Sequence, residues 1–239
     1  MDGSQTIRVN FGKPMPIFPL DAVVLLPQQV MPLHVFEPRY RQMLDRALDG
    51  SGQIAMAVFA GDEWKQEYHG NPPIRPAVCI GQIVQHEHLT DGRYNVLLQG
   101  VCRARVVEEH MPDETRMYRT ATLEPIGTEG GFGPETSVAI DRIRTWVEEE
   151  LAEGPLRELT VADQVLEYVR NEDVPTPALI ELLSFALVTE PGARYRLLAE
   201  PELGRRAELV VGQLEDLERL IRLARDQKPE QWPKGLSWN

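Results

Sequence analysis

With 239 residues, of which 42% are hydrophobic and 26% charged, the chain has the composition of a globular protein that can bury a sizeable core. Its net charge is −12, and residues 1–127, with 12 Lys and Arg against 15 Asp and Glu, carry only −3 of it. An acidic chain without a basic cluster suits neither a nucleic-acid backbone nor an anionic membrane. Its apolar runs are also too short to cross a bilayer. We therefore expect no nucleic-acid partner and no membrane partner.

The N-terminal residues 1–15 contain no apolar segment of the kind found in signal peptides. The only cysteines are Cys79 and Cys102, and so few suit a reducing compartment better than a disulfide-rich secreted fold. These two features predict a cytoplasmic protein.

The first half of the chain has the pattern of short β-strands. Asp91-Gly92, between two alternating runs, is the strongest short hairpin signal and predicts a two-residue turn, in which both positions need positive φ. Gly81 and Gly100 lie inside those runs, where glycine often marks a bulge or a barrel corner. Several short strands of this kind favour a small, twisted, partly closed barrel. Strands are expected within residues 16–20, 22–27, 30–36, 53–59, 79–109 on either side of the hairpin turn, and 118–126.

One helix is predicted among these strands. Pro38 suits the first helical position, and Glu37 is expected to cap it. Apolar residues then recur at helical spacing on one face, and a run of Asp, Gly and Ser ends the helix. The apolar positions are Tyr40, Met43, Leu44, Ala47 and Leu48.

The glycine-rich stretch 127–135 predicts a boundary between a β domain, 1–127, and a helical domain, 128–239. Thr160 and Asp163 resemble a capping box, and Thr176-Pro177 opens a run that is apolar nearly all round. Helices are expected at 136–151, after Thr160, from Thr176, at 191–200 and from 203 onward.

The last helix carries a heptad-like apolar seam over residues 203–224. The seam could dock on the helical bundle, or it could form a homodimer or recruit another partner. The tail beyond it contains Trp232 and Trp238, which could be a partner motif, could dock on their own domain or could be disordered.

A search for catalytic motifs is negative. The sequence has no G-x-x-x-x-G-K-[ST] loop, no G-x-S-x-G elbow and no C-x-x-C. His86 and His88 would share a strand face, but no third metal ligand accompanies them. Arg103 could lower the pKa of the Cys102 thiol, although a buried inert cysteine is the favoured interpretation. We therefore expect no enzyme, no catalytic residue, no cofactor and no metal.

The densest polar cluster lies in MPLHVFEPRYRQML, residues 31–44. Each polar residue has a structural explanation: Glu37 as a cap, Arg39 in solvent or paired with nearby acids, Tyr40 on the apolar helix face and His34 on a strand. A catalytic interpretation using His34, Glu37 and Tyr40 stays open, although no further group at a defined spacing completes a dyad or triad.

The same segment resembles the opening of the N-terminal substrate-binding domain of Lon protease, and especially the stand-alone bacterial proteins that carry this domain. A second block, with Ile80-Gly81-Gln82-Ile83 and a strand ending at Gly100 before Arg103 and Arg105, also fits the family pattern. The resemblance covers residues 14–126 well, with Gln28 standing where the family often has glycine. The first block comprises Leu20, Val24, Pro27, Met31, Pro32, Leu33, Val35, Phe36, Glu37, Arg39 and Tyr40.

The resemblance implies an α+β fold: a PUA-like β-barrel with one early helix, followed by an α-helical bundle that ends in a long helix. It also implies a non-catalytic module, because 239 residues without a P-loop leave no room for the ATPase and peptidase parts of Lon. The implied partners are proteins or peptides with exposed apolar segments, held in a groove between barrel and bundle. The predicted binding residues, chosen by their place in the motif, are Met31, Leu33, His34, Phe36 and Tyr40.

Two other classes of function stay open. One is an interaction or regulatory protein that works through the helix at 203–224, by dimerisation or by recruiting a partner. The other, less favoured, is an enzyme or small-molecule binder that uses His34, Glu37 and Tyr40. The sequence does not identify the ligand or the oligomeric state.

Overall fold

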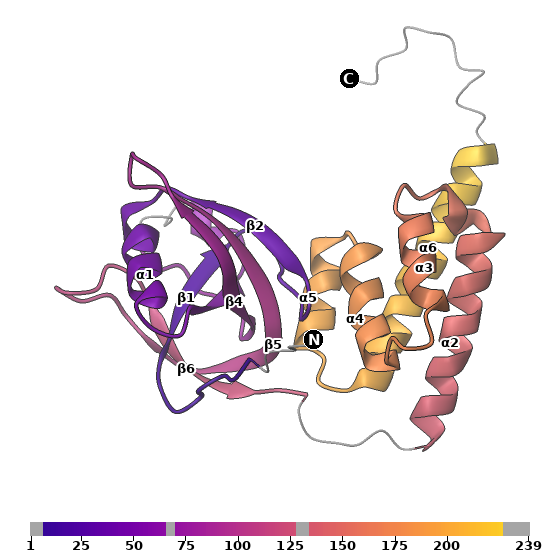
Figure 1. Ribbon diagram of the computed structural model, residues 1–239, viewed down its shortest axis with the longest axis horizontal. Helices are drawn as coiled ribbons and strands as arrows, with labels where there is room; N and C mark the ends of the chain where they lie inside the picture. The colour runs from indigo at the N-terminus through magenta and orange to yellow at the C-terminus, as the bar shows by residue number, and fades with distance from the viewer. Residues whose placement is uncertain (1–6, 66–69, 128–133, 227–239) are drawn as a thin grey trace, which may run out of the picture. The chain divides into compact units, whose positions relative to one another are not determined.

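A computed structural model describes residues 7–65, 70–127 and 134–226, with side chains from residue 142 onward in the last range (Figure 1). Contacts divide the chain into two compact units. One unit contains the β-strands and the first helix together with Thr189–Glu202, and the other contains the remaining long helices. The mixed α+β class expected from the sequence is confirmed. None of the described helices is both long and apolar enough to cross a membrane.

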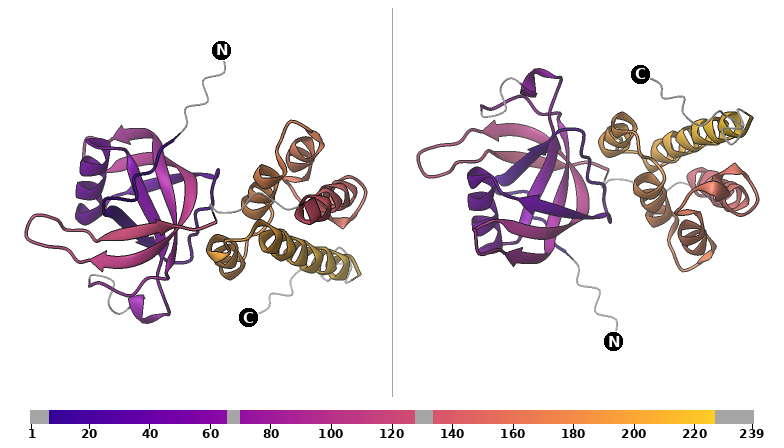
Figure 2. Two further views of the ribbon diagram at one scale, coloured as in Figure 1. Left: turned by 90° about the horizontal axis from the view of Figure 1, so that it is seen from below. Right: turned by 90° about the horizontal axis from the view of Figure 1, so that it is seen from above.

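The first unit is built on a six-stranded sheet in the order β2-β5-β4-β3-β1-β6. β1 and β3 are parallel, and the other pairings are antiparallel. Because β6 pairs with both β1 and β5, five of the strands form a ring of pairings (Figure 2). The label PUA-like stays a prediction. The strands are β1 (Met15–Leu20), β2 (Val30–Val35), β3 (Gln53–Val58), β4 (Ala77–His88), β5 (Tyr94–His110) and β6 (Thr120–Pro125).

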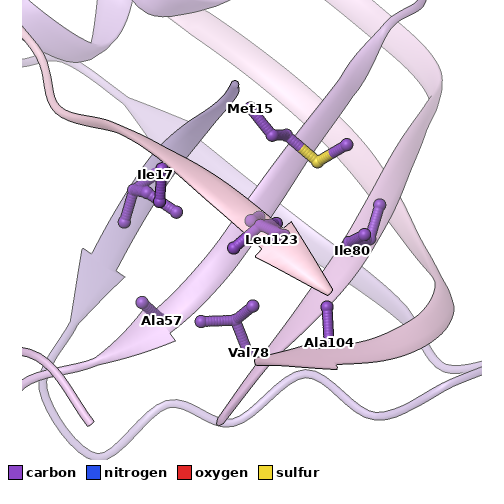
Figure 3. Packing of buried hydrophobic residues seen from close by; sticks show 9 residues of the cluster. Met15, Ile17, Ala57, Val78, Ile80, Ala104 and Leu123 are labelled. Carbon is purple, nitrogen blue, oxygen red and sulfur yellow. The ribbon is translucent and has the colours of Figure 1, made fainter. Parts of the chain in front are cut away.

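The apolar core of this unit has a mixture of large and small side chains on the strands of the ring (Figure 3). Ile17, Val78 and Ile80 have no exposed surface, and neither have the four alanines of the same cluster. Large and small side chains buried together in this way are typical of close packing. The buried cluster comprises Met15, Ile17, Ala55, Ala57, Val78, Ile80, Ala104, Ala121 and Leu123.

The predicted bend at the two strand glycines is present. The β4–β5 register shifts between Ile80 and Gly81, and Gly81 then pairs with Gly100. A Cβ atom on Gly100 would lie 2.1 Å from the backbone oxygen of Leu26, so only glycine fits there. This close approach lets the chain segment before β2 lie against β5 at Gly100.

Two local predictions from the first half are wrong. Residues 22–27 form no strand, because Ala22 and Gln28 have positive φ (54° and 66°) and the chain turns there; Val24, Leu25 and Leu26 are nonetheless buried. At the β4–β5 hairpin only Gly92 has positive φ, so the turn is longer than a two-residue one. Leu89 and Arg93 close it through a hydrogen bond of 2.8 Å from the Leu89 N–H to the Arg93 carbonyl.

Helix α1 (Pro38–Leu48) packs on β1 and β3, as its apolar face predicts. Tyr40 is 4% exposed and meets Phe18 edge to face, with ring centroids 4.6 Å apart. The Tyr94 hydroxyl on β5 donates to Asp45 at 2.5 Å and ties the helix to the sheet. Glu37 stands at the N-cap position, but its side chain makes no cap bond and pairs with Arg39 instead, so its predicted capping role is wrong.

The segment Thr189–Glu202 contains helix α5 (Pro191–Ala199) and belongs to the first unit by its contacts. The Tyr195 hydroxyl accepts from the Ala77 N–H at 2.9 Å, and the buried Arg103 donates to the Leu197 carbonyl at 3.1 Å. The domain division expected at residue 127 stays a prediction. The sequence could not assign α5, because its anchoring contacts reach residues about a hundred positions away.

The second unit contains α2 (Pro134–Ala152), η2 (Pro155–Glu158), α3 (Ala162–Arg170), α4 (Thr176–Ala186) and α6 (Leu203–Asp226). A further short 3-10 turn, η1 (Glu63–Lys65), lies in the first unit. Helix α4 begins at Thr176 as predicted, but α3 begins after Val161 without a side-chain cap, so the capping box is wrong. A buried ion pair, Glu181 with Arg206, joins α4 to α6 at 3.4 Å.

The apolar seam of α6 is buried in the second unit over its first half. Leu203, Ala207, Val210 and Leu214 are at most 5% exposed. Of the later seam positions, Leu217 and Ile221 are half-buried and Ala224 is exposed. Leu220 and Leu223, which lie off the seam, are 61% and 51% exposed. The tail with Trp232 and Trp238 lies outside the described residues.

Candidate binding groove

The strands β2, β5 and β4 present two very different faces. Directly opposite residues in antiparallel strands share a face, and successive residues alternate between faces. Val35, Tyr94, Val96 and Leu98 are buried on the face toward Asp45 of α1. The opposite face is open, and its rows are Pro32–Leu97–Gln85 and His34–Asn95–Glu87.

The open face forms a groove of about 400 Å³. Three consecutive residues from each strand line it: 32–34 of β2, 85–87 of β4 and 95–97 of β5. The volume falls within the range typical of ligand sites. Leu97 is half-buried and Pro32 exposed, so the groove has apolar surface between its polar side chains.

A polar row crosses the groove; we use this name for Glu87, Asn95 and His34. The Nδ1–H of His34 donates to Oδ1 of Asn95 at 2.8 Å, and Nδ2 of Asn95 donates to Oε2 of Glu87 at 3.0 Å. This pattern places the proton of a neutral His34 ring on Nδ1, so Nε2 can accept from Arg93 at 3.3 Å. The row therefore fixes three exposed side chains in one orientation.

The hairpin turn beside the row supplies an exposed ion pair. Arg93 donates to Asp91 at 2.6 Å, and this hydrogen bond is the main cause that lowers the pKa of the Asp91 carboxyl to about 2. The same contact raises the pKa of the Arg93 guanidinium. Asp91 is therefore ionised throughout the physiological range, and Arg93 is held beside His34.

Exposed apolar side chains flank the groove on β2 and just after it. Val30 is 51% exposed and Phe36 is 59% exposed. The Phe36 ring stacks on His34 with centroids 6.3 Å apart. Large exposed apolar side chains next to a groove are typical of interaction surfaces.

The structure brings together only part of the predicted residue set. His34 lines the groove with its side chain, and Phe36 stacks on His34 beside it. Leu33 borders the groove but pairs with the buried Val96, so its side chain belongs to the opposite face. Met31 is half-buried and lies opposite Leu98, on the buried face. Tyr40 is in the core against Phe18, so it supports the fold and lies outside the groove.

The sequence reasoning missed the groove residues on β4 and β5: Gln85, Glu87, Asn95 and Leu97. Their alternation around the hairpin was a usable signal, since a hairpin places such residues opposite one another. What the sequence did not reveal was that β2 pairs with β5 across 61 residues of chain, as His34 and Asn95 do.

The other candidate chemical groups have structural roles. His88 stacks on Tyr94 at 4.4 Å, away from the polar row. Burial raises the pKa of the Cys102 thiol despite the opposing charge of Arg103, which makes the thiol less reactive. Within the described ranges, no three or more His, Cys, Asp or Glu side chains gather where they could hold a metal.

The fold and groove define an α+β protein with an open groove on its sheet. The model of the ATP-dependent protease La (LON) substrate-binding domain matches residues 14–216, so the chain belongs to this family. Lon protease of Solibacter usitatus is 31% identical over 137 residues, which are 57% of this chain and 16% of that protein. Lon protease of Trichlorobacter lovleyi is 26% identical over 187 residues, 77% of this chain and 20% of that protein.

Solved structures agree on the fold. The N-terminal domain of Mycobacterium avium complex Lon protease superposes with a TM-score of 0.65 at 19% identity, over 85% of this chain and 99% of that one. The Lon N-terminal domain protein from Xanthomonas campestris gives a TM-score of 0.52 at 20% identity, over 84% and 98% of the two chains. The chain thus spans a fifth or less of the curated relatives above and nearly all of these solved domains.

Proposed function

We propose that this chain binds exposed apolar segments of other polypeptides, and that the groove on β2, β5 and β4 is where it does so. The single observation that carries the proposal is an open groove of about 400 Å³ with Leu97 and Pro32 between oriented polar groups. Apolar contact would supply binding energy, and the polar row would orient the bound chain. Membership of the substrate-binding family supports the same class of ligand.

The test measures binding of a fluorescein-labelled ten-residue peptide of alternating leucine and threonine by fluorescence anisotropy. Leu97→Asp places a charge in the groove and is expected to weaken binding by at least about tenfold. Val107→Asp is the matched control, because Val107 is also on β5, is 60% exposed and lies ten residues from the groove. Equal affinity of the two variants, with both folded by circular dichroism, would refute the site.

We also propose that the chain acts without catalysis, as a cytoplasmic module on a PUA-like barrel. The sequence has no P-loop motif, and the family model that matches is a substrate-binding domain. The ring of strand pairings supports the barrel. ATP hydrolysis by the purified chain, measured as phosphate release above a buffer blank, would contradict the proposal.

The end of α6 supports a second candidate function, self-association or recruitment of a partner. Leu220 and Leu223 are more than half exposed on a helix whose earlier seam is buried. If this surface forms a homodimer, light scattering gives twice the chain mass, and Leu220→Lys with Leu223→Lys restores the monomer. A monomeric parent chain would remove the dimer from consideration.

A further inference from the structure

The edge strand β2 has a free side. β2 pairs with β5 on one side, through six residue pairs from Val30–Gln99 to Val35–Tyr94 (Figure 1). Among the described residues, no backbone hydrogen bond runs from β2 to any segment on its other side. Val30, Pro32 and His34 are all exposed.

The hydrogen-bond pattern shows which backbone groups point outward. At the start of the ladder Gln28 N–H donates to Gly100 at 2.7 Å, and Gly100 N–H donates to Gln29 at 2.8 Å. Hydrogen-bonded and non-hydrogen-bonded pairs alternate along an antiparallel ladder. Counting from Gly100, the groups of Val30, Pro32 and His34 therefore point away from β5.

These outward groups form a template for another extended chain. They comprise the N–H groups of Val30 and His34 and the carbonyls of Val30, Pro32 and His34, spaced about 6.7 Å apart along the edge. The backbone of an extended polypeptide offers donors and acceptors at the same spacing. Since such pairing reads the backbone, it accepts many sequences.

β2 also lacks most of the devices that protect natural edges. Its sequence, VMPLHV, contains no Lys, Arg, Asp or Glu, whereas edge strands are commonly guarded by charges. Pro32 is the one protective residue, because it removes a single outward donor. The exposed Phe36 and the groove lie beside this edge.

We propose that an extended segment of a bound polypeptide adds to β2 as a further strand of the sheet, with its alternate side chains over the groove. This inference rests on the proposed function and goes beyond it by naming backbone pairing at Val30, Pro32 and His34 as the means of recognition. The occupant is an extended, unfolded stretch of another protein.

The decisive test uses two forms of the leucine–threonine peptide that differ only in backbone methylation. One form carries N-methyl groups on every leucine, and the other carries them on every threonine. Only alternate N–H groups of an added strand face β2. One form is therefore expected to lose binding and the other to keep it; equal affinities, whether both retained or both lost, overturn the proposal.

Pro32→Ala gives a test of opposite sign. Strand addition predicts binding roughly twofold to tenfold tighter, because alanine restores one hydrogen-bond donor to the edge. Contact through the proline ring alone predicts weaker binding, because alanine has less apolar surface. Since this N–H would face away from β5, the variant is expected to fold, and its thermal unfolding checks this.

The outcomes separate the two proposals. If the unmethylated peptide does not bind the parent chain, the proposed function fails and strand addition fails with it. A second outcome is that the unmethylated peptide binds the parent chain, Leu97→Asp loses this binding, and the two methylated forms bind equally well. In that case the proposed function stands and strand addition fails. A third outcome is that Pro32→Ala forms a dimer through its β2 edge and gains no affinity for the peptide. This result would identify a second copy of the chain, and not a substrate, as the occupant of the edge.

Discussion

The two faces of β2, β5 and β4 are built from alternate residues of the same strands, yet they differ in almost every property. One face is mostly apolar and buried along β2 and β5, and it is joined to α1 by the hydrogen bond from Tyr94 to Asp45. The other is open and carries the polar row above the groove. The comparison suggests that one face stabilises the fold and that the other is free to bind, so substitutions one residue apart should separate the two roles.

Leu98 and Leu97 provide the largest expected contrast. Leu98 has no exposed surface, and Leu98→Ala is expected to lower the free energy of unfolding by about 2–5 kcal/mol because it leaves a cavity. Leu97 is half-buried on the groove side, and Leu97→Ala is expected to cost under about 1 kcal/mol. Urea unfolding of both variants measures the difference. Similar decreases in the free energy of unfolding would contradict the separate roles of the two faces.

Tyr94→Phe should have an intermediate effect, about 0.5–1.5 kcal/mol, because it removes the hydrogen bond from the buried Tyr94 hydroxyl to Asp45, whose exposed carboxylate water can then solvate. The hydrogen bond to Asp45, with burial, raises the pKa of Tyr94 to about 12 from an ordinary value near 10. Above pH 10 the unfolded chain releases this proton first, so parent stability should fall between about pH 10 and 12. The variant should lack this part of the alkaline loss in thermal unfolding followed against pH.

Asn95→Ala should have the smallest effect on stability. It removes the centre of the polar row, but its three members are exposed and water can replace the lost hydrogen bonds. The free energy of unfolding is expected to change by at most about 0.5 kcal/mol. A loss above 1 kcal/mol in urea unfolding would show that the open face also holds the fold together.

Much of the fold was predictable from the sequence because its signals are local. The alternation around Asp91-Gly92, Pro38 before an apolar helical face, and Thr176-Pro177 each place an element that the structure contains. The same reasoning failed for residues 22–27, where the apolar run led us to expect a strand. Most of the run is buried, but positive φ at Ala22 and Gln28 makes this segment a loop. Burial and strand pairing are separate properties, and hydrophobicity reports only the first.

The binding groove shows where sequence reasoning stops. The motif around His34 identified β2 as the candidate strand. Because successive residues of a strand alternate between its faces, His34 lies on the opposite face from Met31 and Leu33. Tyr40 belongs to the helix face that covers the core, which its helical spacing already indicated. The partners of His34 on β5 and β4 depend on long-range pairing, which leaves no local trace in the chain.

By itself, the sequence determined the elements, their apolar faces and the family, since these depend on local spacing and on motifs read along the chain. Only the tertiary structure decided that Asn95 and Glu87 complete a row with His34, that Thr189–Glu202 belongs to the first unit, and that β5 is the one strand paired with β2 among the described residues. Each of these depends on which distant segments become neighbours. The collective packing of the core sets those contacts, and no single stretch of residues encodes them.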